Sequence, residues 1–269
     1  MNRLLILPLL VAALAACERE KPAAAPVPSR TAAPQPAATP PVGLQDVVES
    51  QPGYMVGITF PKSAARYPGL AAEIKAYADA ARAELVRAAE GRGNDGSAGD
   101  MYDLSLTFTD VMETPDLVAV AADGSSYTGG AHGNPLLARF VWLPKQNQRL
   151  TAKRLVPNAA HWKPISDLVR EQLHTALSQR LDADQLPPAD RVQMARSAGK
   201  MIDEGTKPDA SNFSQFEPVP GPGGKLAGLK FVFPPYQVGP YSDGVQSVQL
   251  PAAALLPYIA PEYRGLFAQ

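Results

Sequence analysis

Residues 102–109 read Tyr-Asp-Leu-Ser-Leu-Thr-Phe-Thr, with a large apolar or aromatic side chain at every second position. Successive side chains of a β-strand point to opposite faces, so this alternation predicts a strand with one buried and one solvated face. Residues 54–60 alternate in a similar way, and Pro61 ends them. Shorter apolar runs at 117–121 and 137–143 predict two further strands. Because the later strands follow one another directly, we expect an antiparallel sheet.

A helix is expected between the first two of these strands. Residues 63–90 carry apolar side chains at three- and four-residue spacing, with charged side chains at the other positions. This spacing is typical of an amphipathic helix that packs one face against a core. The glycine-rich run 91–96 ends the helix, because glycine readily leaves the helical conformation.

The second half of the chain has helical periodicity first and strand patterns afterwards. Apolar residues from Ile165 to Leu181 predict a long helix, and the pair Pro187 and Pro188 introduces a second one that ends near Glu204. Three strands are expected next, at 213–219, 226–233 and 245–250. A short closing helix is expected at 252–259. We therefore predict the α+β class: antiparallel sheets with packed helices, in two consecutive sub-domains.

Composition divides the chain into four segments. Residues 1–16 are predicted to be a signal peptide, with one basic residue and then an apolar run. Residues 17–46 are predicted to be a linker, and the two sub-domains to cover 47–149 and 150–269. Within the linker, residues 18–43 contain seven Pro and seven Ala. Such a segment buries too little apolar surface to offset the entropy of ordering, so we expect a disordered, extended tether.

Cys17 is the only cysteine of the chain. The preceding residues, Leu14-Ala15-Ala16-Cys17, resemble the bacterial lipobox. The resemblance implies cleavage before Cys17, a diacylglyceryl thioether on its sulfur, and acyl chains such as palmitate that anchor the protein in a membrane. Glu18 in place of Asp favours the outer membrane, with the protein facing the periplasm. The alternative is an ordinary secretory signal followed by a chance cysteine.

Charge and composition exclude several classes of protein. The formal net charge is −1 over 269 residues, whereas a nucleic-acid-binding protein needs a basic surface that displaces counterions from phosphate. A single Cys excludes an internal disulfide framework and a Cys-based zinc site, and only three His are present. We therefore expect no metal, no cofactor and no nucleic-acid partner.

The run Tyr127–Gly133 combines three Gly with one of the three His residues. We interpret it as a structural turn between strands, in which Gly129 and Gly130 supply positive φ and His132 caps the turn by a hydrogen bond. The alternative is a catalytic loop of an envelope-acting hydrolase, in which His132 would work with a nearby carboxylate such as Asp110 or Asp243. No Gly-x-Ser-x-Gly nucleophile accompanies the run, so we predict no catalytic residues.

Two motifs in their order along the chain carry a family resemblance. The first is the Gly-Gly-Ala-His run within 127–133. The second is 231–244, which reads Phe-x-Phe-x-Pro-Tyr-x-x-Gly-Pro-Tyr-x-Asp-Gly. The pair resembles the extracytoplasmic domain shared by RsiV-type anti-sigma factors and PdaC-type peptidoglycan deacetylases, over roughly residues 50–260. The resemblance implies the α+β fold, and it implies lysozyme binding as in the RsiV member. The deacetylase activity belongs to a separate domain that this chain has no room for.

The second motif supplies the candidate binding residues Pro235, Tyr236, Pro240 and Tyr241. Tyrosine and proline lose little conformational entropy on binding, and tyrosine offers both a ring face and a hydroxyl. The same residues would also suit a proline-stiffened edge strand that resists aggregation. The function predicted is a non-catalytic lipoprotein binding module of the cell envelope, with a lysozyme-type muramidase or a peptidoglycan-related molecule as ligand.

Overall fold

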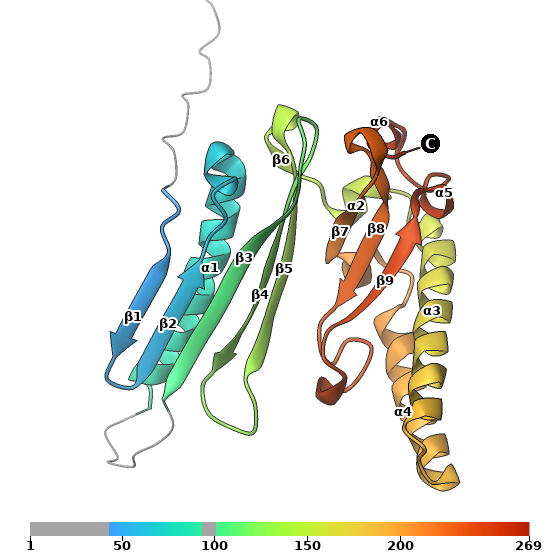
Figure 1. The fold of residues 1–269 in the computed structure, drawn as a ribbon, viewed down its shortest axis with the longest axis horizontal. Helices are drawn as coiled ribbons and strands as arrows, with labels where there is room; N and C mark the ends of the chain where they lie inside the picture. Colours follow the sequence, from blue (N-terminus) through green and yellow to red (C-terminus); the bar gives the residue numbers. More distant parts are fainter. Residues whose placement is uncertain (1–42, 93–100, 269) are drawn as a thin grey trace, which may run out of the picture. The chain divides into compact units, whose positions relative to one another are not determined.

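The computed structural model describes residues 43–92 and 101–268. The lipobox, Cys17 and most of the predicted linker lie outside these residues. The first sheet has six strands, in the order β1 to β6 along both the chain and the sheet (Figure 1). Their bounds are β1 Val47–Gln51, β2 Tyr54–Thr59, β3 Tyr102–Glu113, β4 Val118–Tyr127, β5 Asn134–Leu143 and β6 Gln148–Arg149.

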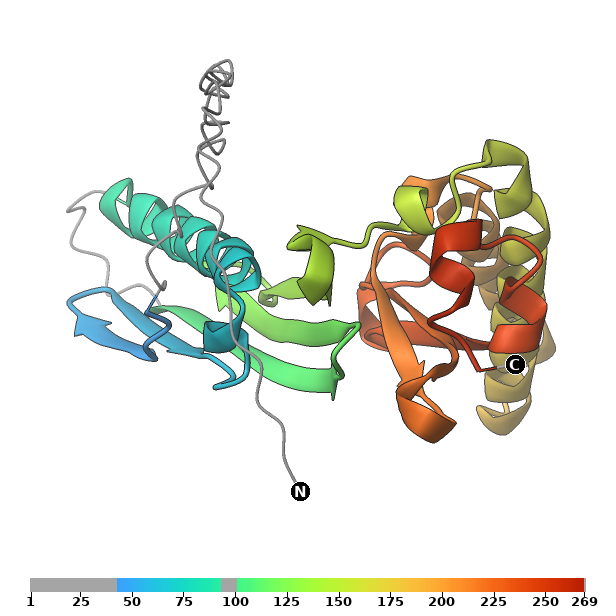
Figure 2. The ribbon, with the colours of Figure 1, turned by 90° about the horizontal axis from the view of Figure 1, so that it is seen from above.

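Helix α1 (Pro68–Glu90) covers one face of this sheet (Figure 2). Its apolar stripe packs against the inward side chains of β2 and β3, including Leu104, Leu106 and Phe108, all of which are buried. The predicted helix start at residue 63 is wrong, because a short 3₁₀ turn precedes Pro68, the first helical residue. Proline suits that position because the N–H it lacks would have no partner there.

One strand pair differs from the expected antiparallel arrangement. Strands β2 and β3 are parallel, in a register that sets Val56 opposite Leu104. The reason is topological: the chain leaves β2, crosses the sheet as α1 and returns in the same direction, which is the connection that parallel neighbours require. The other sheet neighbours are antiparallel, and the α+β class is confirmed.

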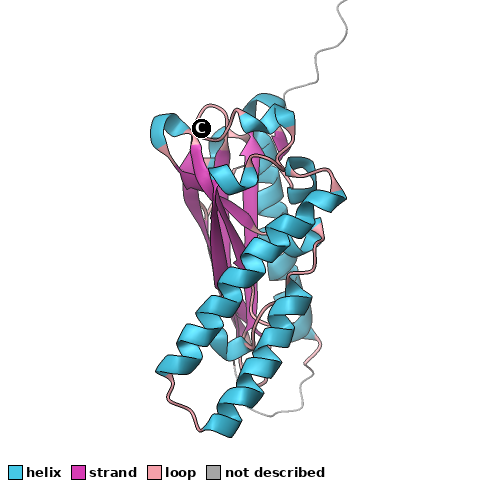
Figure 3. Ribbon diagram, turned by 90° about the vertical axis from the view of Figure 1, so that its right-hand side faces the viewer, coloured by secondary structure: helices cyan, strands magenta, loops and turns pink. Residues whose placement is uncertain are grey.

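The second sheet has three antiparallel strands in the order β7-β8-β9. Two long helices cover it, seen in front of the strands in Figure 3. The bounds are α2 Ala152–Leu155, α3 Trp162–Ala183, α4 Pro188–Gly205, β7 Phe216–Pro220, β8 Leu226–Phe233, β9 Gln246–Pro251, α5 Ala252–Leu255 and α6 Pro261–Arg264. The closing helix expected at 252–259 is thus only one turn long.

The second sheet contacts the first through β7, which lies against β3, β4 and β5. Arg139 of β5 donates its backbone N–H to Gln215 Oε1 at 2.8 Å, and its buried side chain forms an ion pair with Glu217 of β7 at 2.5 Å. Ala119 and Val141 turn away from α1 and join the core beneath the second sheet. Strands β4 and β5 therefore bury side chains on both faces, one toward each sheet's helices.

Candidate functional site

The first part of the site is the turn that joins β4 to β5. Gly129 and Gly130 have φ of 93° and 104°, a region that glycine enters without steric penalty. Tyr127, the last residue of β4, donates its hydroxyl to the Gly130 carbonyl at 3.2 Å. His132 Nδ1 lies 3.1 Å from the carbonyl oxygen of the adjacent Gly133. The turn therefore holds an exposed imidazole at the partly exposed end of the β4–β5 hairpin.

The second part is the loop between β8 and β9, residues 234–244. An edge strand was the alternative for this segment, and the structure shows a loop instead, because Pro234 and Pro235 have no N–H to donate to a sheet. Gln237 N–H bonds to the Pro234 carbonyl at 3.1 Å, and Tyr236 N–H bonds to the Gly239 carbonyl at 2.9 Å. These bonds close a tight turn with Tyr236 at its outer corner.

Tyr236 has φ of 73°, a left-handed conformation that a bulky side chain rarely adopts. It follows a proline in the turn, at the position where a type II turn normally requires glycine. Its side chain is also 55% exposed, so the ring is not held there by burial in the core. A non-glycine residue in a strained conformation at an exposed corner is a feature that clusters at ligand-binding sites.

The two parts meet through their aromatic side chains. Tyr236 Oη lies 3.0 Å from His132 Nε2, although the two residues are 104 positions apart. The His132 ring stacks on the Tyr241 ring, with centroids 3.8 Å apart and planes 13° from parallel. With the proton on Nδ1, His132 donates a hydrogen bond to the Gly133 carbonyl, and Nε2 accepts a hydrogen bond from the Tyr236 hydroxyl. We call Tyr236, His132 and Tyr241 the Tyr–His cluster.

Contacts within the second sheet and its helices fix the 234–244 loop. Gln237 donates its side-chain amide to the backbone carbonyls of Gly205, at the end of α4, and Asn212. A Cβ at Gly205 would lie 2.0 Å from the Gln237 carbonyl oxygen, so only glycine permits this approach. Asp243 pairs with Arg180 of α3 at 2.8 Å. The cluster therefore stands on a loop with a defined backbone path.

The remaining predicted residues lie beside the cluster or apart from it. Pro235 is half-buried and Pro240 is exposed, and both flank the aromatic rings along the loop. The two carboxylates proposed for the hydrolase are engaged elsewhere: Asp110 accepts a hydrogen bond from Ser63 and Asp243 pairs with Arg180. In the described part of the chain, the polar contacts of His132 are with Gly133 and Tyr236.

Sequence reasoning missed the ion pair that aligns the two halves of the site. Glu217 contacts both Arg139, from the first sheet, and Lys230, its cross-strand neighbour. Arg139 is a charged residue inside the apolar run 137–143, and a buried arginine requires a partner. The position of Arg139 was therefore a signal for a buried ion pair. The sequence alone could not name that partner, which lies on a different sheet.

Within residues 43–92 and 101–268, none of the helices combines the length and apolar character needed to cross a bilayer. Over the same residues, no three His, Cys, Asp or Glu side chains gather in a way that could hold a metal ion.

Comparison with known proteins finds a family model that matches part of the chain. Among curated proteins, none matches it. Similar solved structures include a DUF3298 family protein from Pseudomonas aeruginosa PAO1 (20% identity, 84% of this chain and 96% of that one, TM-score 0.49). They also include a DUF3298 family member from Bacteroides fragilis NCTC 9343 (14% identity, 79% of this chain and 87% of that one, TM-score 0.48). Residues 155–253, which include Tyr236 and Tyr241 but not His132, match the family model described as "Protein of unknown function (DUF3298)".

Proposed function

We propose that the protein is a non-catalytic lipoprotein binding module of the cell envelope, and that the Tyr–His cluster is its recognition surface. The observation that carries the proposal is Tyr236, which is exposed, held at positive φ and hydrogen-bonded to a histidine of the other sheet. A solvent-facing side chain brings no core packing to offset the backbone strain. Ligand binding would explain why tyrosine rather than glycine occupies this corner.

The chemistry of the cluster suits recognition of another macromolecule. Two tyrosine rings and an imidazole, with Tyr236 and Tyr241 centroids 5.8 Å apart, form a small aromatic surface with hydroxyl groups at its edge. Tyrosines of this kind dominate the binding energy of many protein interfaces. The resemblance to RsiV-type domains makes a lysozyme-type muramidase the first ligand to test, and peptidoglycan the second.

The proposal places the domain at a membrane surface through a lipid on Cys17. Glu18 favours the outer membrane, facing the periplasm, and the Pro/Ala-rich tether would separate the domain from the lipid. In that location the domain could meet a muramidase or the cell wall itself.

The test is titration of the full chain with hen-type lysozyme by calorimetry. Tyr236→Gly removes the ring and relieves the strained backbone, so folding stability should stay within about 1 kcal/mol of wild type. Its affinity should fall by a factor of about 30, corresponding to about 2 kcal/mol for a central interface tyrosine. The matched control is Tyr258→Ala, which removes a tyrosine packed beside a different histidine, His161.

The outcomes separate the two ligands and the alternative function. Unmeasurable wild-type affinity for lysozyme, together with co-sedimentation with peptidoglycan, would move the proposal to the second ligand, and failure with both would refute it. The carboxylates of the hydrolase alternative are engaged elsewhere, so a hydrolase would instead have to use His132 with the Tyr236 hydroxyl, which lies 3.0 Å away. A hydrolase of this kind would lose peptidoglycan hydrolysis in Tyr236→Phe. An absence of hydrolysis by the wild-type protein would exclude it.

A further inference from the structure

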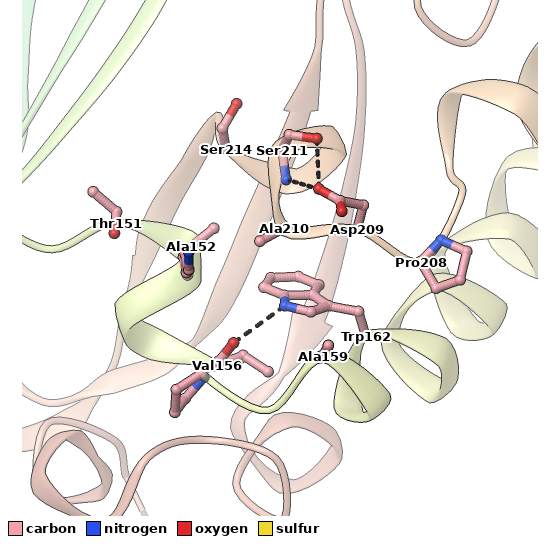
Figure 4. Close-up of a pocket in the computed structure, with 12 residues that line it drawn as sticks. Thr151, Ala152, Val156, Ala159, Trp162, Pro208, Asp209, Ala210, Ser211 and Ser214 are labelled. Atoms are coloured by element: carbon pink, nitrogen blue, oxygen red, sulfur yellow. Dashed lines mark hydrogen bonds between the residues drawn. The ribbon is translucent and has the colours of Figure 1, made fainter.

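A pocket of about 490 Å³ lies on the second half of the chain, between α2, the start of α3 and the segment before β7 (Figure 4). It is separate in its residues from the Tyr–His cluster. The residues lining it are Thr151, Ala152, Lys153, Val156, Pro157, Ala159, Trp162, Pro208, Asp209, Ala210, Ser211 and Ser214. Its volume is within the range of about 300–1,000 Å³ typical of small-molecule sites.

The wall of the pocket is apolar and fixed in place. Trp162 is buried and stacks on Phe213, with centroids 5.1 Å apart and planes 15° from parallel. Its indole N–H donates to the Val156 carbonyl at 3.2 Å, so no polar atom of the ring is left for a ligand (Figure 4). With Val156 and Ala210 beside it, the ring offers a rigid surface for an aliphatic group.

Two opposite charges at the pocket have unused bonding capacity. Asp209 Oδ1 accepts from the Ser211 N–H and hydroxyl at 2.8 and 2.6 Å, whereas Oδ2 has no partner among the described residues. The Lys153 ammonium likewise has none there, and it forms no ion pair with Asp209. The Ser211 hydroxyl and N–H, with a smaller contribution from Lys153, hold the pKa of Asp209 below its ordinary value. Both residues line the pocket and are exposed at its rim, and they form no ion pair with each other.

We propose that this pocket binds a free α-amino acid with an aliphatic side chain. The ligand's ammonium would meet Asp209 Oδ2, its carboxylate would meet Lys153, and its side chain would lie against Trp162. A free amino acid carries both charges within a few atoms of its apolar group, which is the combination that the lining offers. A single charge on the ligand would leave one rim residue unpaired.

The ligand dependence of the pocket is tested on the full chain with L-leucine. Two analogues each remove one charge: L-leucinamide lacks the carboxylate and 4-methylpentanoate lacks the ammonium. Each should bind about tenfold more weakly than leucine, because one charge-assisted contact is lost. Calorimetry gives the affinities. The indole N–H resonance of Trp162 should shift, while that of Trp142, in the core of the first sheet, should stay in place.

Variants test the assignment of each residue. Asp209→Asn keeps an oxygen for the Ser211 N–H but loses the charge, and Lys153→Gln loses the other charge; each should weaken leucine binding about tenfold. Ala159→Phe should fill the pocket and abolish binding. The matched control Lys163→Gln removes an exposed lysine that pairs with Asp167 outside the pocket, and should change nothing.

Three results would overturn the proposal. The first is no leucine binding by wild type at millimolar concentration. The second is equal affinity for leucine and both analogues, which would mean that the rim charges do not recognise the ligand. The third is leucine binding that survives Ala159→Phe in a protein whose Trp142 resonance is unchanged, since the variant would then be folded and the ligand bound elsewhere.

Discussion

Replacement of Glu217 by glutamine removes the central charge of the contact between β5 and β7. In the wild type, Glu217 Oε1 meets Arg139 and Oε2 meets Lys230, each at 2.5 Å. The side chains of Arg139 and Glu217 are only 6% and 8% exposed. Lys230 is 41% exposed, so it can regain hydration when its partner is neutralised. Arg139 cannot.

The magnitude follows from what Arg139 would keep. Its Nη1 bonds to the carbonyls of Ala122 and Ala138 at 3.0 Å, and its Nη2 pairs at 2.9 Å with Asp123, which is 54% exposed. Breaking a buried ion pair by removing one partner destabilises a protein by about 3–5 kcal/mol. Because Asp123 and two carbonyls remain, we expect the lower end of that range, about 3 kcal/mol.

Urea denaturation of Glu217→Gln, followed by circular dichroism, measures this value. The double variant Arg139→Met/Glu217→Leu removes both charges and should recover most of the loss, because apolar replacement of a buried pair is often neutral. Asp116→Asn breaks the exposed pair with Lys145 and should shift the urea midpoint far less than Glu217→Gln does, because an exposed ion pair contributes little to stability. A loss below about 1 kcal/mol for Glu217→Gln would refute the claim that this charge is buried and required.

Three further predictions concern other parts of the chain. Cys17→Ser should release the protein from membranes or leave the signal uncleaved, as shown by fractionation and mass spectrometry. Gly205→Ala should lower the free energy of unfolding by about 1–3 kcal/mol, because its Cβ would overlap the Gln237 carbonyl; an unchanged melting temperature would contradict this. A hydrogen bond from Tyr67 lowers the pKa of Glu113 from its ordinary 4.5. The stabilisation from the Glu113 carboxylate is therefore complete above pH 4.5 and is lost as the pH falls through the lowered pKa. The melting temperature of Glu113→Gln should accordingly fall less steeply with acid than that of wild type.

The elements with strict periodicity were the predictable ones. The alternation at 102–109 falls within β3, and the long helix predicted from Ile165 to Leu181 lies within α3. Strand β1 was missed because Val47–Gln51 carries too few apolar residues to show a pattern, and the polar end of β4, Asp123–Tyr127, was missed for the same reason. Pairing with neighbours, which no local pattern records, makes these segments strands.

The candidate site was predictable as two separate motifs but not as one surface. Gly129 and Gly130 predicted a turn, and the prolines predicted a stiff segment, each from local chemistry. The contact between His132 and Tyr236 depends on how the two sheets pack together, and the positive φ of Tyr236 is a conformation that its residue type argues against. Neither feature has a signature in the linear sequence.

The meeting of the two sheets also makes the Tyr–His cluster dependent on residues that never touch a ligand. His132 belongs to the hairpin that contains Arg139, and Tyr236 follows the sheet that contains Glu217. Loss of the buried pair should loosen this contact without separating the sheets, because Ala119 and Val141 of the first sheet remain packed in the core of the second. Glu217→Gln should therefore weaken the stacking of His132 on Tyr241, seen as a ring-current change in the His132 proton resonances under conditions where the protein remains folded. Unchanged His132 resonances in a destabilised variant would show that the cluster is held by its own contacts alone.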